Sequence, residues 1–194
     1  MNPAHEAELE YIAGKLRGQD IKSVLEIGVR NGISLMVWAD LLPPDSRIVA
    51  VDLPNSLWGA NSEQIADEAA RRIAEIHNHD IHMVFGDSHD EKVVERVREL
   101  GPYDFCYIDA DHSYDGVRAD WMNYGPMCRI VAFDDIATVS EVTDAEGNTV
   151  SAGVSKLWAD IKNIAPALNY ELDEFISVAG DKPQGAGIVY RGAA

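Results

Sequence analysis

The feature that most restricts the fold of this chain is a short apolar run that recurs and each time ends at or just before an acidic residue. The runs at 23–25, 48–51, 81–85, 105–108 and 130–133 are β-branched or aromatic and show no polar alternation. Runs of this kind are typical of strands buried on both faces of a parallel sheet. We therefore expect five parallel strands, each carrying an acid at its carboxyl end.

Apolar residues at helical spacing fill the stretches between these runs. A leading helix is indicated before residue 22 by Leu9, Ile12 and Leu16. Alternating strands and helices predict right-handed crossovers and a sheet covered on both faces. The later stripes are Ile65, Ala69, Ile73 and Ile76; Val93, Val97 and Leu100; Val117, Trp121 and Tyr124; and Val154, Leu157, Trp158 and Ile161.

The pattern changes near the carboxyl terminus. Residues 170–176 and 187–190 look like strands, and the link at 178–185 holds glycine and proline, which favours a loop. A loop without a helix joins antiparallel neighbours. The predicted fold is therefore α/β: a doubly wound, Rossmann-like, seven-stranded sheet with five parallel strands and an antiparallel C-terminal hairpin. We expect one domain over residues 1–194, a length that suits a single core.

Charge and hydropathy exclude several partners. The chain carries 33 acids against 16 bases, for a net charge of −17. Such a surface repels phosphate backbones, so we expect no nucleic acid and no anionic membrane as partner. No apolar run approaches the ~20 residues of a membrane span, and residues 1–6 show no signal-peptide pattern, so we expect a cytoplasmic protein. Cys106 and Cys128 lie in apolar stretches and are expected to be free, buried thiols.

The loop after the first run has the composition of a ligand-binding turn. Gly28 and Gly32 allow a tight turn and close approach to a ligand just before a helix. The spacing is not the GxGxxG of dinucleotide binding, and Glu26 would repel a pyrophosphate. An acid here suits a ligand with an amino group and hydroxyls, and Asp52 after the next run suits ribose hydroxyls. The alternative is that both glycines serve only the turn.

These motifs together resemble a known family. The chain is similar to class I S-adenosylmethionine-dependent methyltransferases, closest to the cephalosporin-hydroxylase-like and the catechol or caffeoyl-CoA O-methyltransferase groups. The resemblance covers nearly the whole chain, and its most specific part is 108–117 followed by 133–136. The motifs that carry it are Glu26-x-Gly28-x-x-x-Gly32, Asp52, Gly86-Asp87-Ser88, and Ile108-Asp109-Ala110-Asp111-His112.

The resemblance implies S-adenosylmethionine as cofactor and a small-molecule methyl acceptor. Its motifs imply that the first loop lines the methionine end, that Asp52 holds the ribose, and that Asp87 and Ser88 lie beside the adenine. The complete cofactor set that we expect is Glu26, Gly28, Gly32, Ser34, Asp52, Asp87, Ser88 and Asp109.

The resemblance also implies a magnesium site at Asp109, Asp134 and Asp135. Independently, three carboxylates near one point repel one another and favour a hard divalent cation with oxygen ligands. The alternative is that the aspartate pair caps a turn and Asp109 meets only the cofactor. His112 stands where catechol-type enzymes have a lysine base, so His112 and Asp109 are the expected catalytic residues, with a solvent-exposed His112 as the alternative.

The favoured interpretation is metal-assisted O-methylation of a small hydroxylated molecule. The alternatives are a non-catalytic cofactor-binding module and a nicotinamide-dependent oxidoreductase. An iron hydroxylase needs two histidines and a carboxylate around one iron, and we cannot assign such a set. The acceptor pocket would be covered by the polar segment 137–153, which we expect to be a loop and a lid, by Trp58 or by a partner subunit, so a homodimer is compatible with the sequence.

Overall fold

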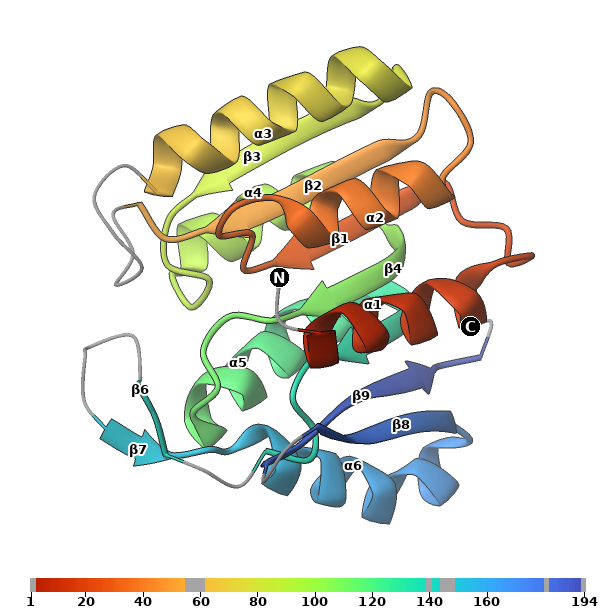
Figure 1. Cartoon of the computed structure of the whole chain (residues 1–194), viewed down its shortest axis with the longest axis vertical. Helices are drawn as coiled ribbons and strands as arrows, with labels where there is room; N and C mark the ends of the chain where they lie inside the picture. Colours follow the sequence, from red (N-terminus) through yellow and green to blue (C-terminus); the bar gives the residue numbers. More distant parts are fainter. Residues whose placement is uncertain (1–2, 55–61, 139–140, 144–148, 180–181, 193–194) are drawn as a thin grey trace.

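A computed structural model describes residues 3–54, 62–138, 141–143, 149–179 and 182–192. Its main sheet has seven strands in the order β3-β2-β1-β4-β5-β9-β8. Figure 1 labels all of these strands except β5. β1 to β5 run parallel, and β9 pairs antiparallel with both β5 and β8. The predicted sheet is confirmed. The strands are β1 (Ser23–Ile27), β2 (Arg47–Asp52), β3 (Asp80–Phe85), β4 (Tyr103–Ile108), β5 (Cys128–Phe133), β8 (Glu171–Ala179) and β9 (Lys182–Tyr190).

Helices cover both faces of this sheet and make three layers (Figure 1). One core lies under α1 (Pro3–Leu16), α2 (Ile33–Leu41) and α3 (Ser62–His77). The other lies under α4 (Glu91–Leu100), α5 (Tyr114–Tyr124) and α6 (Val154–Leu168), with the short 3-10 helix η1 (Gly125–Met127) after α5. Cys106 and Cys128 are free and buried, as predicted. None of the described helices is long and apolar enough to cross a bilayer.

The order in which successive strands are added to the sheet reverses between β1 and β4. The chain crosses from β1 outward through β2 to β3, then returns to place β4 on the other side of β1. Ligands of open α/β sheets bind beyond the carboxyl ends of the strands at such a switch point. Ile27, Ile108 and Phe133 end the three central strands, and the loops that follow them meet at this edge.

The structure corrects three expectations about local structure. Residues 178 and 179 extend β8 and 182–185 extend β9, where we predicted a loop. Proline is tolerated at 183 because β5 pairs with β9 only as far as Gly187, so this part of β9 has one neighbour. On α3 the buried face consists of Ala66, Ala70 and Ile73. The expected Ile65 and Ile76 are exposed, because the buried positions in the first turns lie one residue later than we predicted.

The third correction concerns the segment 137–153. We expected a loop, but β6 (Glu141–Thr143) and β7 (Thr149–Ser151) pair antiparallel as a small ribbon. Residues 139–140 and 144–148 lie outside the described residues, as does Trp58. The predicted roles of Trp58 and of this segment as pocket covers therefore stay predictions.

Candidate functional site

The first loop begins at a buried acid. Glu26, in β1, is fully buried, and its Oε1 accepts a short hydrogen bond from the Ser34 hydroxyl at the start of α2. Its other oxygen, Oε2, and Trp38 Nε1 are buried and form no hydrogen bond within the described chain. Burial raises the pKa of Glu26 to about 8, against the opposing effects of the Ser34 hydroxyl and of the Trp38 indole, which lies close to the carboxylate. A buried acceptor without a donor is the arrangement that an amino group of a ligand satisfies.

The glycines of this loop are required by geometry. Gly28 has φ +90°, and a Cβ there would lie 2.1 Å from the carbonyl oxygen of Asp109. The loops after β1 and β4 thus touch through bare backbone, which fixes the floor of the site. Gly32 also has a positive φ and starts α2, and a Cβ there would lie 2.8 Å from Ala69 of α3. Both positions therefore do more than allow a turn.

Asp52 holds the first loop in place. Its Oδ2 accepts hydrogen bonds from the backbone amides of Val29, at 3.2 Å, and Arg30, at 2.6 Å. Burial raises the pKa of Asp52. The loop at the end of β1 is therefore tied to the end of β2, and the ribose position expected for Asp52 lies at the same edge of the sheet.

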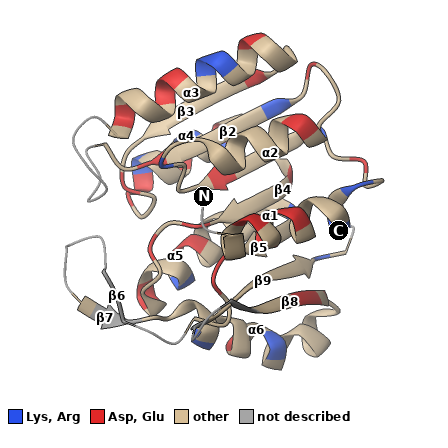
Figure 2. Ribbon diagram, viewed as in Figure 1, with Lys and Arg blue, Asp and Glu red and all other residues tan. Residues whose placement is uncertain are grey.

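Three of the predicted site residues meet where β4 and β5 end. His112 Nε2 lies 3.0 Å from Asp109 Oδ1, and His112 Nδ1 lies 3.4 Å from Asp135 Oδ2. Asp135 Oδ1 also accepts hydrogen bonds from Thr138 Oγ1 and Gln184 Nε2. Figure 2 shows acidic residues at the ends of β4 and β5, beside the start of α1.

Asp134 completes this cluster from a more buried position. Its Oδ1 accepts a hydrogen bond from Tyr107 Oη at 3.0 Å and lies 3.5 Å from His5 Nδ1. Ligand atoms of Asp109, His112 and Asp134 lie within 4.8 Å of one another. The predicted acids and the predicted base thus share one location. We name these four residues, Asp109, His112, Asp134 and Asp135, the acidic cluster.

The charges in the acidic cluster depend on one another. Burial, then the charge of Asp134, raises the pKa of Asp109 to about 6. Burial lowers the pKa of His112, but hydrogen bonds with Asp109 and Asp135 outweigh it and raise that pKa well above its usual value. Burial likewise opposes the low pKa of Asp135, which the neighbouring His112 produces. His112 is therefore an imidazolium clamped between two carboxylates, rather than the solvent-exposed residue of the alternative interpretation.

The end of β3 carries the residues expected beside the adenine. Asp87 is exposed and accepts a hydrogen bond from the backbone amide of His89 at 2.8 Å. Ser88 is buried, and its carbonyl accepts a hydrogen bond from Tyr124 Oη at 2.6 Å. Behind them His89 Nε2 lies 3.3 Å from Asp120 Oδ1, a fully buried carboxylate of α5.

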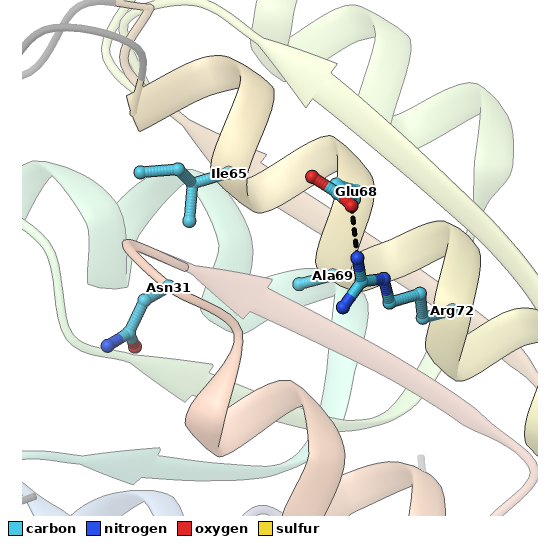
Figure 3. A pocket seen from close by; sticks show the side chains of 5 residues that line it. All are labelled: Asn31, Ile65, Glu68, Ala69 and Arg72. Carbon is cyan, nitrogen blue, oxygen red and sulfur yellow. Dashed lines mark hydrogen bonds and ion pairs between the residues drawn. The ribbon is translucent and has the colours of Figure 1, made fainter.

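A shallow hollow of about 200 Å³ lies beside the first loop (Figure 3). Asn31 lines one side, and α3 supplies the other, including a salt bridge between Glu68 and Arg72. No residue of the acidic cluster lines it. The hollow therefore borders the expected cofactor loop without including the expected reaction centre.

Both ends of segment 137–153 are tied to the acidic cluster. Thr138 Oγ1 bonds Asp135, and the Gly153 amide donates to the carbonyl of His112 at 2.8 Å. A Cβ at Gly153 would lie 2.0 Å from the backbone nitrogen of Tyr114. The ribbon of β6 and β7 therefore leaves from and returns to the site.

Sequence reasoning missed two residues of the site, His5 and Glu8. Glu8 Oε2 lies 3.8 Å from His5 Nδ1, and Asp134 lies next to both. The available signal was the His-x-x-Glu spacing, which places both side chains on one face of a helix. The apolar stripe of Leu9, Ile12 and Leu16 predicted this helix, but it did not show that the first turn of the helix would lie next to Asp134. His5 and His112 thus both lie near Asp134, whereas from the sequence we could not assign two histidines to one carboxylate.

Comparison with known proteins gives independent information. A family model described as "Methyltransferase domain" matches residues 25–136. A relative named "Putative caffeoyl-CoA O-methyltransferase", from Arabidopsis thaliana, is 26% identical over 140 residues, which are 72% of this chain and 57% of the relative. The chain thus spans less than two thirds of that relative.

Solved structures share the fold. An O-methyltransferase from Bacillus cereus, solved in complex with SAH, aligns with TM-score 0.71 and 16% identity over 96% of this chain and 81% of its own. The O-methyltransferase TomG from Streptomyces achromogenes, involved in tomaymycin synthesis and solved with SAM, aligns with TM-score 0.65 and 19% identity over 96% and 80%.

Proposed function

This chain belongs to the family described as "Methyltransferase domain". From that premise we propose that it is a class I S-adenosylmethionine-dependent methyltransferase, and that it methylates an oxygen of a small hydroxylated molecule with the help of a divalent cation. The observation that carries the proposal is the acidic cluster at the switch point of the sheet, with His112 between Asp109 and Asp135. The alternative interpretation as a nicotinamide-dependent oxidoreductase is not supported. It requires a GxGxxG motif after the first strand, which the sequence lacks, and the matching family is a methyltransferase family.

The residues of the first loop fit the cofactor. Glu26 Oε2 is a buried acceptor without a hydrogen bond in the described chain, which suits the amino group of the methionine end. Gly28 lets the loops after β1 and β4 pack backbone against backbone at the edge where the cofactor would bind. Asp52 supplies a carboxylate for the ribose hydroxyls. We propose Asp87 and Ser88 as the residues beside the adenine, and Ser34 and Gly32 as supports of the loop.

The acidic cluster fits a hard cation. Asp109, Asp134 and Asp135 would hold it, since carboxylate oxygens are the donors that Mg²⁺ prefers. When bound, the cation supplies Lewis acidity that lowers the pKa of an acceptor hydroxyl. Within the described residues no lysine or arginine forms an ion pair with these three carboxylates, so His112 and His5 are the positive partners shown there.

His112 is proposed to receive the acceptor's proton at Nε2 or Nδ1. An imidazole clamped by two carboxylates is a stronger base than a free one. It accepts that proton only as a neutral imidazole, so its own proton must first pass to solvent. A cation held by Asp109 and Asp135 would favour this loss by competing with His112 for both carboxylates. Asp109 would orient the acceptor oxygen toward the methyl group. If segment 137–153 closes over the acceptor, proximity would supply much of the rate.

One observation favours a second candidate, the non-catalytic cofactor-binding module. Both ring nitrogens of His112 already face carboxylates, which is also the arrangement of a purely structural ion pair. This candidate predicts binding of S-adenosylmethionine without methyl transfer to any acceptor, with or without a divalent cation.

We further propose that segment 137–153 closes the acceptor pocket, supported by its attachment to Asp135 at one end and His112 at the other. A homodimer that completes the pocket stays a prediction, testable by light scattering. The cytoplasmic location, the absence of nucleic acid as partner and the single-domain organisation are likewise proposals that rest on charge and length.

The test is calorimetric titration of metal-stripped protein with S-adenosylmethionine, repeated with saturating Mg²⁺. A panel of small catechols and other vicinal diols then follows, with methyl transfer measured by the release of S-adenosylhomocysteine. Cofactor binding with Mg²⁺-stimulated transfer supports the proposal. Binding without transfer supports the module, and absence of binding under both conditions overturns the cofactor assignment.

A further inference from the structure

Helix α1 brings a second set of possible metal ligands to Asp134. His5 and Glu8 are three residues apart, so their side chains leave the same face of α1. His5 Nδ1 lies 3.5 Å from Asp134 Oδ1 and 3.8 Å from Glu8 Oε2. One ligand atom from each of the three residues lies within 4.8 Å of the other two. We name these three residues the α1 triad.

Glu8 supplies independent evidence for a ligand. Its side chain is 0% exposed, and neither of its oxygens forms a hydrogen bond within the described chain. Burying a carboxyl group without partners is costly, so such groups in proteins are usually paired or bind a metal. No lysine or arginine in the described ranges is ion-paired with Glu8, and its nearest ionic partner there is His5. Glu8 therefore faces the His5 imidazole and the Asp134 carboxylate from a fully buried position.

The spacing of the α1 triad suits direct coordination. Nitrogen and oxygen ligands lie about 2.0–2.2 Å from a first-row metal, which at tetrahedral angles separates neighbouring ligand atoms by about 3.3–3.6 Å. The observed separation of 3.5 Å falls within this range, that of 3.8 Å is slightly longer, and the ligand atoms of Glu8 and Asp134 lie within 4.8 Å of each other. Tyr107 Oη already bonds Asp134 Oδ1, and it would orient that carboxylate as an outer partner of the metal.

We propose that His5, Glu8 and Asp134 form a binding site for a divalent first-row transition-metal ion, beside the acidic cluster and sharing Asp134 with it. The imidazole nitrogen sets the class of ion, since imidazole suits Zn²⁺, Co²⁺ and Fe²⁺ whereas Mg²⁺ takes oxygen ligands. This site goes beyond the proposed function, because metal binding by α1 does not depend on methyl transfer.

The test is a titration of metal-stripped protein with Co²⁺ in the presence of saturating Mg²⁺, followed by visible absorption and equilibrium dialysis. We expect one Co²⁺ per chain that H5Q and E8Q each weaken at least about 100-fold, because loss of even an outer-shell partner costs about 10- to 100-fold. Glutamine keeps the shape of both side chains. The control variants are H82Q and D135N, and both should retain this Co²⁺. His82 is paired with Asp80 on β3, at the far edge of the sheet.

A second measurement uses the unaltered protein and so avoids any folding defect of the variants. Zn²⁺ added to ¹⁵N-histidine-labelled protein should shift the Nδ1 resonance of His5 and leave that of His82 unchanged. Equal Co²⁺ affinity in wild type, H5Q and E8Q, no binding by wild type, or a Zn²⁺ shift confined to His112 would each overturn the α1 site. Titration of the same samples with S-adenosylmethionine separates this result from the fate of the proposed function.

Discussion

Nε2 of His112 lies 3.0 Å from Oδ1 of Asp109, at the point where β4 ends. If His112 takes the acceptor proton, H112Q should lower kcat by at least about 100-fold, the usual contribution of a general base. The Kd for S-adenosylmethionine should change little, because glutamine still bonds Asp109. H112K should recover more activity than H112Q, since catechol-type enzymes have lysine there. Steady-state kinetics check both, with H82Q as control, and full activity of H112Q would exclude the base role.

Gly28 allows a test of backbone packing in the first loop. In G28A the new methyl group would lie 2.1 Å from the Asp109 carbonyl oxygen, on a backbone with φ +90°. We expect the free energy of unfolding to fall by about 2–4 kcal/mol and cofactor binding to be lost, because the loops after β1 and β4 must move apart.

Gly14 offers a matched control for this change. It lies in α1, and a Cβ there would have no atom within 4 Å. G14A should stabilise the protein by up to about 1 kcal/mol, since alanine favours a helix over glycine. Urea denaturation measures both variants. A G28A protein as stable as G14A would contradict the close approach of the two loops.

Asp52 makes a separate prediction about the cofactor. D52N keeps an oxygen that can accept the hydrogen bonds from the backbone amides of Val29 and Arg30, so the loop should stay folded. The variant loses the charge proposed to hold the ribose, which should weaken S-adenosylmethionine binding about tenfold, the equivalent of about 1.4 kcal/mol. D80N, at the start of β3, should bind the cofactor like wild type. Calorimetry compares the two, and equal affinities would remove Asp52 from the cofactor site.

The sequence predicted the acidic cluster because parallel strands bring their carboxyl ends together whatever lies between them. Asp109, Asp134 and Asp135 directly follow two neighbouring strands, so adjacency in the sheet was sufficient to bring them to one place. The glycine turn could be identified for the same reason, since its position between a strand and a helix is local.

Other features depend on packing that local patterns do not record. His5 and Glu8 reach Asp134 only because α1 packs against β8, β9 and α2, a contact between distant parts of the chain. The face of α3 was misjudged because its buried side is built mainly from the small residues Ala66 and Ala70 with Ile73, so the larger Ile65 and Ile76 did not mark it. The hairpin was predicted too short because glycine and proline look like a loop even where a strand has one free edge.

The pair of His89 and Asp120 predicts how stability depends on pH. The ion pair with the buried Asp120, 3.3 Å away, raises the pKa of His89 to about 9 from the usual 6.5. Its stabilisation is therefore complete below pH 6.5 and is lost as the pH rises through 9, because in this window the folded state holds a proton that the unfolded state has released. We expect the free energy of unfolding to exceed that of H89Q by about 2 kcal/mol at pH 6.5, and this difference to vanish near pH 9.5. Urea denaturation at several pH values measures it, and H82Q should parallel wild type. A difference between wild type and H89Q that stays constant from pH 6 to 10 would show that Asp120 does not hold the proton on His89.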